Sequence, residues 1–144
     1  MAGTITSANA ILTLSQATLF PAPVQMQQFA ADDVFDTENI RSVEALMGVD
    51  GVLSFGFIYV AIVQNIALQA NSPSNSFFDV IYTQQTAALD IYPLNGTIIL
   101  PGISTKFTLS NGAMTGYKPT PDGKRTLTPR RFQITWNKIA PAPS

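Results

Sequence analysis

One segment of the chain, residues 72–92, has the spacing of an amphipathic helix, whereas almost all the rest has the pattern of short strands. Phe77, Phe78 and Ile81 begin an apolar stripe, and Pro93 prevents the helix from continuing. The stripe extends over Gln84, Ala88, Leu89 and Tyr92. A lone amphipathic helix among strands must bury its stripe against a sheet. We therefore expect a helix at 74–89 on a mainly β fold, a β-sandwich or barrel of antiparallel strands with one packed α-helix.

Alternation of apolar and polar residues predicts the strands. Their ranges are 8–14, 24–29, 42–47, 52–57, 58–70, 106–109, 113–117 and 130–136. Asp50-Gly51 favours a tight hairpin between the third and fourth strands, and Asn95-Gly96 favours another between 91–94 and 97–100. We also expect breaks at Pro21 and Pro23, a capping box from Ser76 and Asp79, a turn at 110–112 and a frayed tail at 140–144.

Charged residues are scarce in this chain. They make up 12% of its 144 residues, about half the usual share, while apolar residues make up 46%. A single domain over residues 1–144 is the natural expectation for this length. A monomer of this composition would have a large neutral surface, which is easier to explain if much of it faces other protein.

The few charges are sorted along the sequence. Residues 1–90 hold eight acids and one base, a net charge of −7, and residues 91–144 hold one acid and seven bases, a net charge of +6. Two interpretations remain open. The halves neutralise each other within one monomer, or the basic face of one copy docks on the acidic face of the next. The second arrangement is a head-to-tail contact, which builds rings or open stacks.

The residue types needed for common catalytic chemistry are missing. The chain has no cysteine and no histidine, so nucleophilic triads and zinc sites lack their usual groups. The acids at 32–38 could form a solvated loop, an interface loop or a cation site, but they lack the spacing of a calcium loop. We expect no enzyme activity, no cofactor and no metal.

Membrane insertion is not expected either. Residues 51–78 carry no charge, but polar residues interrupt them, and the longest apolar run, 57–63, is too short to cross a bilayer. The first ten residues show no targeting signal.

Three stretches resemble segments of tail tube proteins and tube-like baseplate proteins of contractile-tailed bacteriophages. They are residues 29–36 (FAADDVFD), 47–51 (MGVDG) and 127–136 (LTPRRFQITW). The resemblance implies homo-hexameric rings that stack head-to-tail, with sheets joined across subunits into an inner barrel and the helix outside. It also implies a location in the virion after synthesis in the host cytoplasm, with tail sheath and baseplate proteins as partners and DNA passing through the lumen without specific binding. A tube subunit and a baseplate adaptor remain alternatives.

The charged loops are the expected contacts between subunits. On the acidic side these are Asp32, Asp33, Val34, Phe35, Asp36, Glu38 and Asp50, and on the basic side Lys118, Lys124, Arg125, Arg130 and Arg131. Two rival functions remain. One is a tail fibre domain that binds a receptor and forms trimers. The other is a single-stranded nucleic-acid binder, because the basic residues lie near aromatic ones, although the net charge of −1 argues against it.

Overall fold

The computed structural model describes residues 10–27, 29 and 35–143 of the chain. Its elements are β1 (Ile11–Gln16), β2 (Phe20–Gln25), β3 (Phe35–Thr37), β4 (Val43–Met47), β5 (Leu53–Phe57), β6 (Ile62–Leu68), α1 (Asn75–Ala88), β7 (Leu94–Leu100), the short 3-10 helix η2 (Pro101–Ile103), β8 (Thr105–Tyr117) and β9 (Arg130–Pro143). The fold is mainly β with one α-helix, as expected.

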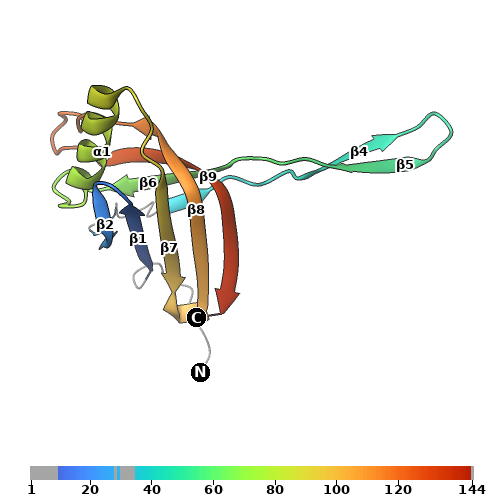
Figure 1. Cartoon of the computed structure of the whole chain (residues 1–144), viewed down its shortest axis with the longest axis horizontal. Helices are drawn as coiled ribbons and strands as arrows, with labels where there is room; N and C mark the ends of the chain where they lie inside the picture. Colours follow the sequence, from blue (N-terminus) through green and yellow to red (C-terminus); the bar gives the residue numbers. More distant parts are fainter. Residues whose placement is uncertain (1–9, 28, 30–34, 144) are drawn as a thin grey trace.

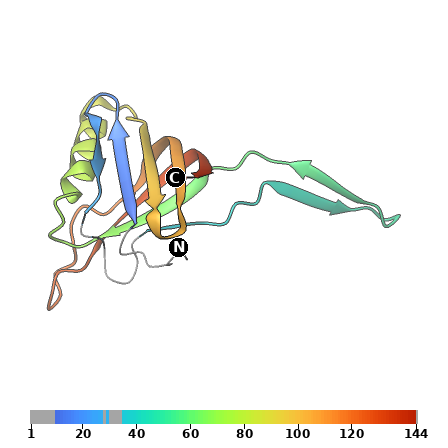
Figure 2. The same cartoon turned by 90° about the horizontal axis from the view of Figure 1, so that it is seen from below.

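Seven of the strands form one antiparallel sheet in the order β2-β1-β7-β8-β9-β6-β3. The sheet curls, and α1 lies across one of its faces (Figures 1 and 2). The helix buries Phe77, Phe78 and Ile81 against the sheet. Phe78 stacks on Phe132 of β9 with ring centroids 4.2 Å apart. Trp136, also in β9, is fully buried. The architecture is therefore a single curled sheet with a helix, rather than two stacked sheets.

Strands β4 and β5 form a separate two-stranded hairpin, here called the arm (residues 38–61 including its stem). The arm connects β3 to β6 and projects far from the curled sheet (Figures 1 and 2). Its pairing from Val43↔Phe57 to Met47↔Leu53 confirms the predicted hairpin. Gly51 has a φ of 86°, which glycine adopts readily, and the Val52 amide donates to Asp50 Oδ1 at 3.1 Å.

Two predicted turns are wrong, because β7 and β8 each run straight through them. Asn95-Gly96 lies inside β7, where a Cβ on Gly96 would stand 2.6 Å from the carbonyl oxygen of Thr13. The glycine is thus needed for close strand packing rather than for a turn. Asn111, at the other predicted turn, has a φ of 50° within β8, and its amide donates to Asn95 Oδ1 at 3.2 Å.

Three further expectations about local structure are also wrong. Pro21 and Pro23 lie inside β2, which tolerates them because it is an edge strand paired only to β1. The tail is not frayed up to Pro143, which pairs with Thr105. The helix has no capping box, since Ser74 is the N-cap residue and makes no side-chain cap.

The apolar stripe of the helix is shorter than predicted. Burial ends with Ile81, and Leu89 is 89% exposed in the left-handed conformation that terminates α1. Ser74 instead fixes the start of the helix to the chain after β2, because its Oγ accepts a hydrogen bond of 2.8 Å from the Gln27 amide. Ser76 Oγ donates to the Pro73 carbonyl at 2.8 Å.

Candidate assembly surfaces

The arm has one apolar face that nothing covers within the part of the chain that the structure describes. Residues directly opposite each other in an antiparallel pair point to the same side. The pairs Val43↔Phe57, Ala45↔Phe55 and Met47↔Leu53 therefore share a face. Every residue of this face is exposed, Phe55 and Phe57 each to 68%. The opposite face carries Glu44, Leu46, Ser54 and Gly56.

This arrangement is unfavourable for an isolated monomer. A two-stranded hairpin is marginally stable in water without a third strand or a packed helix. Contiguous exposed apolar surface of this kind marks an interaction site. Asp50 lies at the arm tip and is exposed. The hairpin was predicted from the sequence, but its apolar face was not. The alternation of apolar residues at 43, 45, 47, 53, 55 and 57 is the sequence signal that indicates this face.

A partly buried ion pair fixes the helix to the sheet. Arg130, at the start of β9, is only 6% exposed. Its Nη2 donates to Asp79 Oδ1 of α1 at 2.7 Å, and its Nη1 donates to Asp79 Oδ2 at 3.2 Å. Its Nε also donates to the Lys118 carbonyl oxygen at 3.1 Å. This two-point contact joins α1, β9 and the segment after β8.

Tyr117 completes this cluster. Its hydroxyl donates to Asp79, and its ring stacks on that of Tyr82 with centroids 4.3 Å apart. The hydrogen bonds from Arg130 hold the pKa of Asp79 below its ordinary value of 3.8, although partial burial opposes this shift. Burial and the hydrogen bond to Asp79 raise the pKa of Tyr117 above 10.0. The cluster holds α1 on the sheet, because the guanidinium of Arg130 binds groups of its own chain.

The basic loop between β8 and β9 lies at the surface. Lys118 forms an ion pair of 3.2 Å with Asp122, four residues further on. Lys124 and Arg125 are exposed. Arg131 is exposed as well, and strand alternation puts it on the sheet face opposite Phe132 and the core. The five predicted basic contact residues thus lie in three places. Arg130 lies beside the helix, Lys118, Lys124 and Arg125 lie in the loop, and Arg131 lies on the sheet face away from the helix.

The acidic segment is only partly described. Asp32, Asp33 and Val34 lie outside the described residues. Phe35 and Asp36 belong to β3, which replaces part of the predicted loop by pairing with β6. Phe35 is partly buried and packs against the core, whereas Asp36 and Glu38 are exposed. Asp36 Oδ1 accepts a hydrogen bond of 2.9 Å from Asn65 Nδ2.

The sheet face away from α1 carries a chain of linked polar side chains, here called the polar ladder (Asp36, Asn65, Gln133, Thr115 and Thr135). Asn65 binds Asp36, and Gln133 Nε2 donates to Asn65 Oδ1 at 3.4 Å. Thr115 Oγ1 lies 3.2 Å from Gln133 Oε1 and 2.9 Å from Thr135 Oγ1. The ladder crosses β3, β6, β9 and β8 and is uncharged except for Asp36. Such a face offers hydroxyl and amide groups to the surroundings and few fixed charges.

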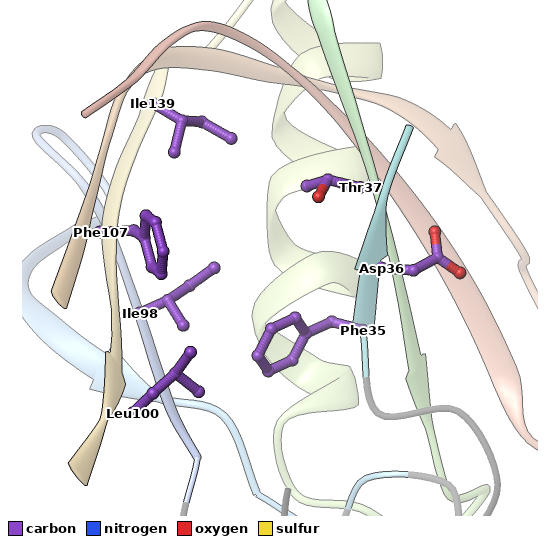
Figure 3. Close-up of a pocket in the computed structure, with 7 residues that line it drawn as sticks. All are labelled: Phe35, Asp36, Thr37, Ile98, Leu100, Phe107 and Ile139. Carbon is purple, nitrogen blue, oxygen red and sulfur yellow. The ribbon is translucent and has the colours of Figure 1, made fainter. Parts of the chain in front are cut away.

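An apolar cavity lies on the other face, between β3 and the strands β7, β8 and β9 (Figure 3). Its volume is about 280 Å³. Phe35 points into it from one side, and Ile98, Leu100 and Phe107 point into it from the other (Figure 3). Asp36 and Thr37 of β3 and Ile139 of β9 complete its lining. Asp36 is the charged residue of this lining, and its carboxylate points away from the cavity (Figure 3), so the cavity suits an apolar side chain rather than a reaction.

The described residues contain neither a metal-binding cluster nor a membrane-spanning helix. No cluster of three or more acidic side chains there could hold a metal ion. No helix in that part of the chain is long and apolar enough to cross a bilayer.

The fold occurs in contractile injection systems. It matches a chain in the sheath/tube terminator of an extracellular contractile injection system in the extended state, with a TM-score of 0.62, 11% identity and 96% of both chains covered. A chain in the sheath-tube complex of such a system gives a TM-score of 0.61 and 12% identity, over 98% of this chain and 93% of that one. The expected likeness to tube and baseplate proteins is thereby confirmed at the level of the fold.

A third structure, the 6-fold symmetrised baseplate of the anti-feeding prophage, matches with a TM-score of 0.56 and 13% identity over 99% of this chain and 98% of that one. A search of curated protein sequences gives no match. The family model described as tail fiber protein gp32 matches residues 3–140, and the chain belongs to that family of tail proteins.

Proposed function

We propose that the chain is a non-enzymatic structural subunit that forms homo-hexameric rings in the tail tube or tube-like baseplate of a contractile phage particle. The observation that carries the proposal is the arm, whose apolar face is exposed over its whole length. A subunit with such a surface gains stability by covering it with another chain. The tail-protein family and the shared fold support the same assignment.

In this proposal the two faces of the sheet have different tasks. The helix faces outward, toward a sheath or baseplate protein, and the polar ladder faces the lumen. A wall of hydroxyl and amide groups favours passage of DNA, because cation–phosphate contacts dominate non-specific affinity for DNA. Arg130 is kept off this wall by its bonds to Asp79. Arg131 is the basic residue of the predicted contact set that lies on this face.

The charged contacts between subunits are proposed to join the arm to the basic loop. Glu38 and Asp50 belong to the arm, and Lys124 and Arg125 are exposed in the loop. Each such contact between exposed groups contributes little, up to about 1 kcal/mol, and is screened by salt. The apolar face therefore supplies most of the association energy, and the charges orient the partners.

Assembly of the purified chain tests the proposal. Light scattering coupled to size exclusion would give the mass of the particle, and negative-stain images would show its symmetry. Hexameric rings or hollow tubes are expected at high protein concentration. A chain that stays monomeric over the whole accessible concentration range, with or without tail proteins from the same particle, would contradict it.

A tail fibre domain is the second candidate, because the description of the matching family favours it. Fibre domains of this kind would form trimers. The same light-scattering measurement separates the two functions, since a mass of three subunits supports the fibre and a mass of six supports the ring.

A further inference from the structure

Within the described residues, the cavity and the arm are apolar surfaces that the fold leaves uncovered. The cavity is lined by apolar side chains and opens between β3 and β7–β9 (Figure 3). The arm presents Phe55, Phe57, Leu53 and Met47 on one face, each of them exposed. One surface is concave and the other convex, and both are apolar.

We propose that the cavity between β3 and β7–β9 receives an aromatic side chain from the apolar face of the arm of a second copy of this chain. This inference rests on the proposed function and names the receiving site within it. Phe55 and Phe57 are the side chains best suited to it, because they are the largest on that face. An aromatic side chain gains most from complete burial in such a pocket, and edge or stacked contacts with Phe35 and Phe107 add to this gain.

The arm of the same copy cannot fill the cavity. Strand β3 forms one wall of the cavity and leads directly into the arm. From there the arm runs away from the curled sheet, so β5, which carries Phe55 and Phe57, lies far from β7–β9, which line the cavity (Figures 1 and 2). An arm that fills the cavity must therefore belong to another chain, and a second copy always carries the matching arm. Such a contact is heterologous, since each copy gives an arm and receives one.

Charge favours the same pairing. The arm segment 38–61 carries Glu38, Glu44 and Asp50 against Arg41. The rest of the chain carries six acids and seven bases, a net charge of +1, and all seven bases lie in residues 106–138. Two of these bases, Lys106 and Lys138, belong to β8 and β9, the strands that carry the cavity residues Phe107 and Ile139. A negative arm is therefore attracted to the basic region formed by β8, β9 and the loop between them in another copy, which raises the rate of encounter and disfavours arm-to-arm contacts.

Residues 1–9 of the same chain are the rival occupant. They offer less apolar surface than the arm, since Ile5 is the only large branched apolar residue among them. The experiment therefore includes a variant that reports this alternative.

Disulfide trapping tests the proposal without background, because the chain has no cysteine. One preparation carries Phe55→Cys on the arm and the other carries Leu100→Cys in the cavity. They are mixed and mildly oxidised with a copper–phenanthroline complex. We expect a disulfide-linked dimer that contains one chain of each kind, at several times the yield of any homodimer. Phe57→Cys and Ile139→Cys provide a second pair in case one variant fails to fold, and circular dichroism checks each fold.

Thr83→Cys is the matched control, since Thr83 is exposed on α1 and outside the cavity. A mixed dimer with Phe55→Cys that forms as readily at Thr83 as at Leu100 would overturn the proposal. So would efficient closure within one chain in the double variant Ile5→Cys/Leu100→Cys. Rings that form from the unmodified chain while neither cavity cysteine is trapped by the arm would overturn this inference and leave the proposed function intact. A failure of the unmodified chain to assemble would count against the proposed function itself.

Discussion

At the scale of single residues, the Arg130–Asp79 pair decides how the helix is held. Asp79→Asn keeps the size of the side chain but leaves the buried guanidinium without a counter-charge. We expect it to lower the free energy of unfolding at pH 7 by about 1–3 kcal/mol, the range for hydrogen bonds to charged groups. Asp79 is partly exposed, so the loss belongs at the lower end of this range. Urea unfolding followed by tryptophan fluorescence measures it, and Asp79→Asn/Arg130→Met shows how much of the loss is the unpaired charge.

The pH dependence of stability follows from the same cluster. Because the pKa of Asp79 is lowered by folding, its contribution is complete above the ordinary value of 3.8 and is lost as pH falls through the folded-state pKa. Tyr117 has a raised pKa, so its contribution is complete below 10.0 and is lost as pH rises through the folded-state value. The unmodified chain should therefore lose more stability than Asp79→Asn when acidified from pH 5 to pH 2. Equal acid sensitivity of the two chains would show that Asp79 does not titrate as described.

Gly112 provides a steric test of the core. A Cβ at this position would lie 2.3 Å from Trp136 Cε3, so alanine must displace a buried indole ring. We expect Gly112→Ala to lower the free energy of unfolding by about 1–3 kcal/mol through overpacking. Gly123→Ala is the matched control, because a Cβ there meets no atom within 4 Å. A loss of the same size in both variants would contradict this explanation.

At the scale of secondary-structure elements, the arm separates folding from assembly. Phe55→Ser/Phe57→Ser removes two large apolar side chains that are already 68% exposed in the monomer. The melting temperature of the monomer should stay nearly unchanged, because surface substitutions of this kind alter stability by less than about 0.5 kcal/mol. Ring formation should be lost, as measured by light scattering. Ser54→Thr, on the opposite face of the same strand, should assemble normally.

The elements that sequence patterns identified are those whose environment is local. The helix, the arm hairpin and the alternating start of β9 follow from spacing and turn chemistry. The two wrong turn predictions concern β7 and β8, where Gly96 and Gly112 serve close packing across the sheet. In a single sequence, a glycine needed for a turn and a glycine needed for a close approach look the same. The Arg130–Asp79 pair was missed for a similar reason, since its partners lie 51 residues apart.

At the scale of the whole molecule, the chain is an acidic arm attached to a nearly neutral body, in which all seven bases lie in residues 106–138. If these charges orient the subunits, assembly should be slower at 0.5 M than at 0.05 M sodium chloride, because surface charges are screened over about 10 Å at 0.1 M salt. Asp50→Lys, at the arm tip, should slow assembly at low salt and should matter less at high salt. Stopped-flow light scattering gives both rates. An assembly rate independent of salt in the unmodified chain would rule out charge steering.

The arm leaves the body on one side only (Figure 2). Any stack in which arms join successive rings is consequently polar, and growth cannot make its two ends alike. One end displays empty cavities and the other displays uncovered arms. A protein that starts the stack must therefore imitate one surface, and a protein that stops it must imitate the other. A single factor that fits one end has no binding site at the opposite end, so initiation and termination of the stack require two different partners.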